Sequence, residues 1–311
     1  MTIRPAPFAL LLLLILPACS LRKPLTARSE SLADARKGFT PHVTGARGGD
    51  PVEAPPSGSL KIVTYPSGVG ELAAYLSPDP GDGRKHPAII WITGGDCNSI
   101  GDVWSPSTPD NDQTAIVYRS VGIVTMYPSL RGGNQNPGVK EGFFGEVDDV
   151  RAAATFLSRQ PYVDPDRIYL GGHSTGGTLA LLVAEISPGF RGVFAFGAVD
   201  DVSGYGTGSE YLPFNASDPK EVELRSPGYW LPSIRSQVWV IEGTGGNIDS
   251  LRTMKSANKN PNVHFVEVRG ADHFSVLGPV NGLIAGKISQ DTGPTSNIAL
   301  TSEEASGALR R

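Results

Sequence analysis

Apolar segments that alternate with helix-like segments constrain the fold of this chain more than any other feature. From Leu60 onward, short and largely apolar runs predict eight strands, at Leu60–Tyr65, Leu72–Leu76, Ala88–Thr93, Gly122–Tyr127, Ile168–Gly171, Val193–Gly197, Val238–Glu242 and His264–Val268. Between the strands, helical spacing of apolar residues predicts helices at Asn111–Ser120, Glu146–Ser158, Thr178–Ile186, Ser250–Ala257 and Val276–Ile288. Two leading strands followed by strand–helix alternation predict an α/β domain, with a mostly parallel eight-stranded sheet and helices on both faces.

The N-terminal residues carry a separate signal. Arg4 is followed by the apolar run Phe8–Leu16, which suits a signal peptide and is too short to span a bilayer. Leu16-Pro17-Ala18-Cys19 then resembles the bacterial lipobox, in which the cysteine is lipidated and becomes the mature N-terminus. We therefore expect a signal peptide at residues 1–18 and a lipid anchor on Cys19. Because Ser20 follows the cysteine, the resemblance implies the periplasmic face of the outer membrane; an ordinary cleaved signal is the alternative.

Residues 19–58 lack sustained periodicity and are rich in Arg, Ser, Gly and Pro, so we expect a flexible tether. The α/β domain is then expected at residues 59–311, with an aromatic and Pro-rich insertion at 203–235. The formal net charge is −4 and no stripe of Lys and Arg is visible, which excludes a nucleic-acid partner. If Cys19 carries lipid, Cys97 has no disulfide partner within the chain and is expected to be a free thiol.

The most informative segment for chemistry is Ile168–Ala180. It contains the pattern G-x-S-x-G as Gly172, Ser174 and Gly176, after a predicted strand and before a predicted helix. A serine hydroxyl is a poor nucleophile unless a base is close and the developing oxyanion is stabilised. A sharp strand-to-helix turn meets both needs, because it lifts the hydroxyl above the sheet and presents backbone N–H groups at a helix start. Ser174 is therefore the candidate nucleophile.

The general base is expected in a loop after a late strand, and only one of the five histidines satisfies this condition. His273 follows the last predicted strand and lies after the serine in the chain, as this motif requires. The remaining histidines lie in the tether, before the central strands, within the serine turn or at a strand start; they are His42, His86, His173 and His264. Thr175 and Gly95 are the expected backbone donors to the oxyanion, since Gly95 belongs to a glycine pair after the third strand.

Three further runs carry a resemblance to a known family. They are Tyr127-Pro128-Ser129-Leu130-Arg131-Gly132-Gly133, Phe144-Gly145-Glu146-Val147-Asp148-Asp149-Val150 and Val163-Asp164-Pro165-Asp166-Arg167-Ile168. With the serine motif, they make the chain from Leu60 to Ile288 resemble the catalytic domain of the prolyl-oligopeptidase branch of the α/β-hydrolases. The resemblance implies a cofactor-free Ser-His-Asp hydrolase that acts on peptides or small esters.

The third member of such a triad is not evident from the sequence. In the family the acid usually stands three residues after a glycine that ends the seventh strand, and here that position holds Gly246. Asp249 lies three residues further along and is our expected acid. The alternatives are Asp200 or Asp201, after the sixth strand, and Glu242, at the end of the seventh. Glu242 stands early for a residue that has to reach the base, and Asp272 would have to fold back on the base.

The chemistry expected from these residues is hydrolysis of an ester or a peptide amide through an acyl-enzyme on Ser174. Metal hydrolysis needs ligand clusters such as H-x-H or H-E-x-x-H, and the sequence contains neither, so no metal or other cofactor is expected. Ester and peptide substrates share the same tetrahedral chemistry, and the sequence leaves them equal. A non-catalytic binding lipoprotein on the same scaffold is the alternative, because the acid is displaced.

Overall fold

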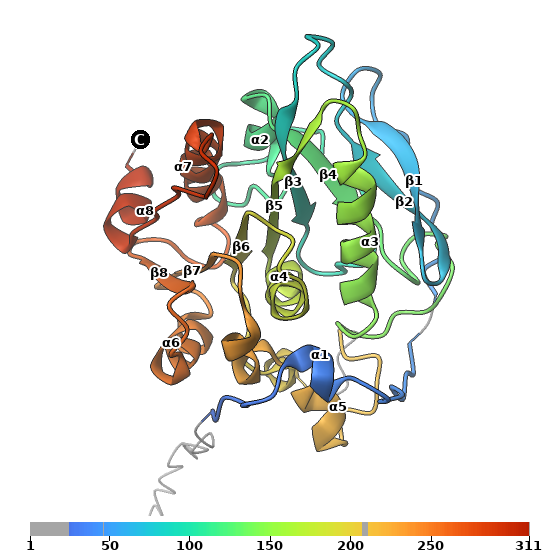
Figure 1. Ribbon diagram of the computed structural model, residues 1–311, viewed down its shortest axis with the longest axis vertical. Helices are drawn as coiled ribbons and strands as arrows, with labels where there is room; N and C mark the ends of the chain where they lie inside the picture. Colours follow the sequence, from blue (N-terminus) through green and yellow to red (C-terminus); the bar gives the residue numbers. More distant parts are fainter. Residues whose placement is uncertain (1–24, 46, 207–210, 311) are drawn as a thin grey trace, which may run out of the picture.

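Eight strands form one sheet in the computed structural model, which describes residues 25–45, 47–206 and 211–310 (Figure 1). In chain order they are β1 (Lys61–Ser67), β2 (Gly70–Leu76), β3 (His86–Ile92), β4 (Val124–Pro128), β5 (Val163–His173), β6 (Gly192–Phe196), β7 (Val238–Gly243) and β8 (Val263–Val268). Each overlaps one of the strands predicted from the sequence.

The strand order in the sheet is β1-β2-β4-β3-β5-β6-β7-β8. β2 is antiparallel to both of its neighbours, β1 and β4. All other neighbouring strands, from β4 to β8 in the sheet order, run parallel to each other. Every residue of β4, β6 and β7 is buried, as expected for parallel strands that are covered on both faces. The predicted α/β class and mostly parallel sheet are confirmed.

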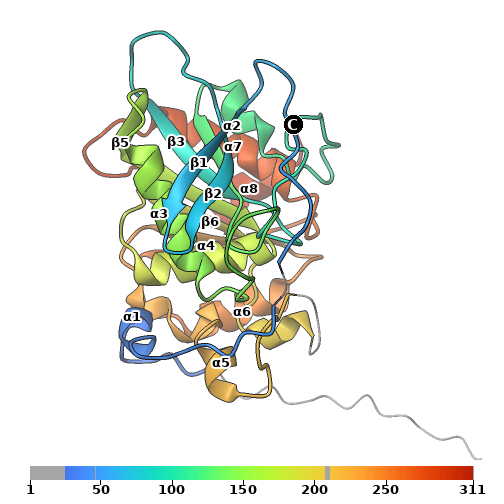
Figure 2. The ribbon, with the colours of Figure 1, turned by 90° about the vertical axis from the view of Figure 1, so that its right-hand side faces the viewer.

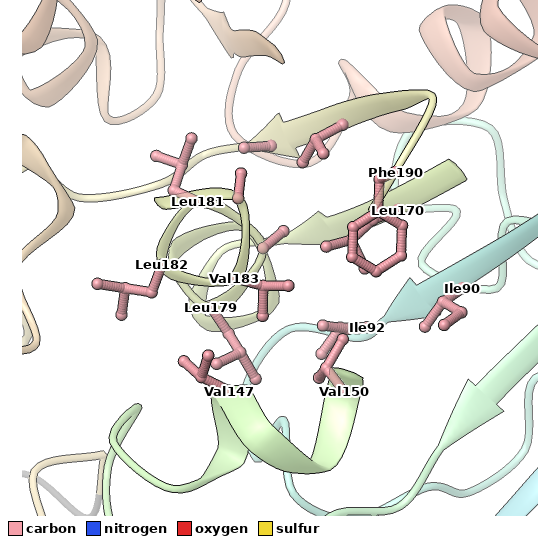
Figure 3. Packing of buried hydrophobic residues seen from close by; sticks show 14 of the residues in the cluster. Ile90, Ile92, Val147, Val150, Leu170, Leu179, Leu181, Leu182, Val183 and Phe190 are labelled. Atoms are coloured by element: carbon pink, nitrogen blue, oxygen red, sulfur yellow. The ribbon is translucent and has the colours of Figure 1, made fainter. Parts of the chain in front are cut away.

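Helices cover both faces of the sheet. They are α1 (Leu32–Ala35), α2 (Ile116–Ser120), α3 (Glu146–Ser158), α4 (Thr175–Ile186), α5 (Pro219–Glu223), α6 (Ile248–Ala257), α7 (Leu277–Gln290) and α8 (Ser302–Ala308). One apolar core lies between the sheet and α3, α4 and α6, and the other lies under α2, α7 and α8 (Figure 1). Figure 3 shows the first core around α4, where Leu179 and Val183 lie among side chains of α3, β3 and β5. In the part of the chain that the structure describes, no helix is long and apolar enough to cross a membrane.

The segment from residue 25 to 58 differs from the expected flexible tether. Leu32 of α1 is fully buried in the core beside α4. The guanidinium of Arg36 donates to the carbonyls of Phe143, Phe144 and Leu224, at 3.0, 2.9 and 2.8 Å. A few isolated anchoring side chains therefore fix a segment that has no apolar periodicity, and the packed domain begins well before residue 59. The remainder of the predicted tether and signal peptide, at residues 1–24, lies outside the described residues.

The insertion predicted at 203–235 packs partly on this N-terminal segment. It contains α5 and short 3₁₀ turns, and Figure 2 shows α5 beside α1 at one end of the molecule. Its first residues approach the serine turn, because the Tyr205 hydroxyl lies 2.7 Å from Thr178 Oγ1 of α4. The Tyr205 ring also stacks on Phe143 with 5.8 Å between centroids. The insertion is therefore attached to the domain at both the N-terminal segment and the serine helix.

Candidate active site

Ser174 stands at the junction between β5 and α4, in a backbone conformation that few non-glycine residues adopt. Its φ and ψ are 54° and −115°, and it caps α4 without using its side chain. Its N–H donates to the Phe196 carbonyl at the end of β6, at 2.8 Å. Such strain is held only where the surrounding structure over-determines it, and it is typical of the exposed nucleophile turn.

The glycines of the G-x-S-x-G pattern are required by close backbone contacts. A Cβ atom on Gly172 would lie 2.4 Å from the Gly176 carbonyl oxygen, and one on Gly176 would lie 2.2 Å from the Ile92 carbonyl oxygen. Both distances are far below van der Waals contact. The sharp turn that presents Ser174 therefore depends on these two glycines.

His273 lies in the loop between β8 and α7, against the same strand end that binds Ser174. A Cβ atom on Gly197, the residue after Phe196, would lie 2.3 Å from Cε1 and 2.7 Å from Nδ1 of the His273 ring. Because Phe196 bonds the Ser174 backbone and Gly197 contacts the His273 ring, β6 brings the two predicted residues to one place. The His273 side chain is 17% exposed, which leaves its ring open on one side.

Glu242 is the carboxylate that contacts His273. It lies at the end of β7 with a side chain that is 2% exposed. Its Oε2 is 3.0 Å from His273 Nδ1, and its Oε1 accepts the N–H of Gly243 at 2.7 Å. A carboxylate on Nδ1 keeps a proton on that nitrogen and leaves Nε2 free to accept one.

The structure corrects the expectation for Asp249. It is the second residue of α6 and is exposed, and the carboxylate that faces His273 Nδ1 is that of Glu242. Asp201 accepts the N–H of Ser203 at 2.8 Å and the hydroxyl of Tyr229 at 3.1 Å, which makes it a turn cap. Asp272 accepts the N–H groups of Phe274 and Ser275, so it shapes the loop of the base and does not fold back on its ring.

Two backbone segments meet where the oxyanion of an acyl-transfer reaction would form. Thr175 is the first residue of α4, so its N–H has no partner within the helix. Gly95 follows β3 in a turn with φ of 73°. Its carbonyl accepts the Thr175 hydroxyl at 2.8 Å and the Cys97 N–H at 3.0 Å. The structure thus brings together the two predicted donor residues and fixes the peptide that follows Gly95.

Comparison with known proteins shows what part of this chain is similar to. Residues 109–225 match the model of the prolyl oligopeptidase family. This part of the chain is therefore similar to the prolyl oligopeptidase family. A curated relative, the uncharacterized peptidase YtmA of Bacillus subtilis (strain 168), is 30% identical over 129 residues, which are 41% of this chain and 47% of the relative.

Solved structures of low identity share the α/β-hydrolase fold. A puromycin hydrolase superposes with a TM-score of 0.60 at 17% identity, over 75% of this chain and 39% of that one. The Pyrobaculum calidifontis esterase superposes with a TM-score of 0.53 at 18% identity, over 78% of this chain and 87% of the esterase. The chain spans less than half the length of YtmA and of the puromycin hydrolase. The superpositions confirm the predicted α/β-hydrolase fold.

The prolyl oligopeptidase family pattern explains why the acid was difficult to locate. Gly246 stands where that pattern has an aspartate, and a Cβ atom there would lie 2.5 Å from Glu242 Oε1. The carboxylate of Glu242, which reaches from the strand end, therefore occupies the space that a side chain at 246 would need. The missing side chain at position 246 is the one feature of the sequence that agrees with Glu242 as the acid.

His173, the residue before the nucleophile, is a second histidine at the site. It is 1% exposed, and its Nε2 donates to the backbone carbonyl of His273 at 2.9 Å. Burial, with the nearby His273 ring, lowers the pKa of His173 to about 3, so the ring is neutral and carries a single N–H. Because Nε2 bears that proton, it cannot accept one from Ser174, and His273 is the only histidine of the described residues placed to act as the base.

The remaining predicted residues differ in what the structure says of them. Cys97 is buried and is a free thiol, and burial raises the pKa of that thiol well above its ordinary value. Cys19 lies outside the described residues. No group of three or more His, Cys, Asp and Glu side chains within the described ranges is placed to hold a metal ion.

Proposed function

We propose that this protein is a serine hydrolase that cleaves ester or peptide amide bonds through an acyl-enzyme on Ser174. The observation that supports this most is the contact of Glu242 with His273 Nδ1 at 3.0 Å, beside a serine held at φ of 54°. The match of residues 109–225 to the prolyl oligopeptidase family model gives independent support for hydrolysis. The names of the relatives, a peptidase and an esterase, agree with both bond types.

The reaction follows from the roles of the three side chains. His273 Nε2 takes the hydroxyl proton as Ser174 Oγ bonds to the substrate carbonyl carbon, and Glu242 stabilises the imidazolium that results. The N–H groups of Thr175 and Gly95 donate to the oxyanion. The imidazolium then protonates the departing alcohol or amine, which leaves an ester on Ser174. Water, deprotonated by His273, hydrolyses that ester, releases the carboxylic acid and restores the serine.

A substrate panel tests the proposal. Acyl esters and short peptide amides are offered to the wild-type protein and to Ser174→Ala, which removes only the nucleophilic oxygen. We expect hydrolysis by the wild type and a loss of about 10⁴–10⁶ in turnover in the variant. Retention of more than a tenth of the wild-type rate by Ser174→Ala would show that another group performs the reaction. The same panel decides between esters and amides.

A non-catalytic binding lipoprotein is the second candidate. It was favoured by the absence of an aspartate at 246, and the contact between Glu242 and His273 removes that argument. A wild-type protein that hydrolyses no member of the panel, yet binds acyl esters or peptides, would support it.

We also propose that Cys19 is lipidated and holds the protein on a membrane, at the periplasmic face of the outer membrane. The support is the sequence Leu16-Pro17-Ala18-Cys19-Ser20 after an apolar run. Stable anchoring is expected, because each buried methylene contributes about 0.8 kcal/mol and lipoproteins carry more than one chain. Fractionation of Cys19→Ala tests this, since a variant found in the membrane pellet as fully as the wild type would contradict it.

A further inference from the structure

His173 joins the nucleophile turn directly to the loop that carries the base. It is the last residue of β5 and precedes Ser174. Its Nε2–H donates to the His273 backbone carbonyl at 2.9 Å, across 100 residues of sequence. Its ring also packs on the His273 ring with 4.5 Å between centroids. One buried side chain thus contacts both the backbone and the ring of the base.

The His173 ring is fixed on its other sides as well. Phe274 lies edge-on to it at 5.5 Å, and the Gln113 side-chain amide lies 3.3 Å from Nδ1. The loop after β3 approaches so closely that a Cβ atom on Gly94 would lie 2.9 Å from Nδ1. A ring confined in this way has one orientation, so the carbonyl that it binds is held at a set distance from the serine turn.

We propose that His173 is a positioning residue, which holds the His273 loop in register with Ser174 through its Nε2–H. This inference rests on the proposed function. Glu242 orients the His273 ring from β7, but a carboxylate on Nδ1 leaves the ring free to move with its loop. The bond to the His273 carbonyl restrains the loop itself. A displacement of about 1 Å between reacting groups can cost about 100-fold in turnover, so this restraint affects catalysis.

Replacement by Met, Gln and Asn separates the hydrogen bond from packing. His173→Met removes the donor and is expected to lower kcat by about 10- to 100-fold with little change in KM. His173→Gln places an amide N–H as many bonds from Cβ as Nε2 is, and is expected to recover most of the loss. His173→Asn places its amide one bond short and is expected to resemble Met. His264→Met, at a histidine that stacks on Trp239 away from the site, is the matched control and should keep wild-type turnover.

A second background distinguishes positioning from a general effect on the fold. In His273→Ala, the base is absent, so its placement no longer matters. His173→Met should therefore cost less than twofold in the residual hydrolysis of an activated ester there, because residues that act as one unit are not additive. Thermal melting reports whether each variant folds. If His173→Met does not fold, the comparison of His173→Gln with His173→Asn still tests the proposal.

Equal kcat values for His173→Gln, His173→Asn and His173→Met would overturn the proposal. So would a loss in the His273→Ala background as large as that in the wild type. These failures differ from failure of the proposed function, in which the wild-type protein itself hydrolyses no ester or amide and does not react with a fluorophosphonate.

Discussion

Glu242→Gln is the substitution that tests the catalytic arrangement most sharply, since it changes one oxygen to nitrogen without changing shape. In the structure Oε1 accepts the Gly243 N–H at 2.7 Å while Oε2 faces His273 Nδ1 at 3.0 Å. Glutamine has a single carbonyl oxygen. If that oxygen stays on the Gly243 N–H, the amide NH₂ faces Nδ1, which must then become an acceptor, and the imidazole proton moves to Nε2.

The size of the effect follows from that change of tautomer. A proton on Nε2 prevents His273 from taking the Ser174 proton, and the wrong tautomer costs about 10⁴ in turnover, which is about 5.4 kcal/mol of transition-state free energy. The opposite amide orientation places its NH₂ against the Gly243 N–H. Glu242 is 2% exposed, so two donors would then face each other without water, at a cost of about 1–3 kcal/mol. The first orientation is therefore expected.

The assay is steady-state hydrolysis of an ester that the wild type cleaves, with melting temperature as the check on folding. Asp249→Asn is the matched control, because it makes the same chemical change at the exposed carboxylate that sequence reasoning favoured, and it should lose less than twofold. Glu242→Asp should also lose most activity, since the shorter side chain cannot span from β7 to Nδ1. The reasoning is refuted if Glu242→Gln keeps more than a tenth of wild-type turnover, or if Asp249→Asn collapses.

Three other predictions concern residues around the site. Gly197→Ala should lower kcat by about 100-fold or more in the same assay, and near-normal turnover would contradict this. The reason is that the new Cβ would lie 2.3 Å from His273 Cε1, at a residue whose φ is 62°. Cys97 should react with a thiol reagent slowly in the native protein and rapidly after unfolding, because burial raises the pKa of its thiol; equal rates would contradict the burial. The pKa of His173 is lowered from 6.5 to about 3 in the folded protein. Between these pH values the unfolded chain therefore binds one proton more than the folded protein does. The free energy of unfolding should keep this contribution above pH 6.5 and lose up to about 1.4 kcal/mol per pH unit as the pH falls below it. In urea unfolding, the free energy of unfolding of His173→Gln should fall less steeply between pH 6.5 and 5 than that of the wild type. An equal slope in the two proteins would contradict the lowered pKa.

The fold was accessible from the sequence because its signals are local. Buried parallel strands are apolar throughout, and the helical period of Glu146–Ser158 matches α3 from first to last residue. What the sequence did not show was the packing of segments without periodicity, such as Leu32 and Arg36 in the N-terminal segment. Helix α8 did carry a signal, since Thr301 and Glu304 form a capping box that the pattern S/T-x-x-E predicts.

The site was accessible only in part, for a physical reason. Ser174 and His273 occupy positions that the order of elements fixes, so the sequence identified them. Glu242 was undervalued because its reach depends on the empty space at Gly246, a contact between residues that only the folded backbone defines. The contact of His173 with the His273 carbonyl depends equally on loop conformation, and no spacing in the sequence encodes it.

Labelling by a fluorophosphonate probe tests the central claim most directly, because only an activated serine reacts with it. The wild-type protein should take up one probe per chain, and mass spectrometry should place it on Ser174. Ser174→Ala should take up none, and Glu242→Gln should react far more slowly than Asp249→Asn. A folded wild-type protein that is not labelled, or is labelled at another serine, would contradict the account.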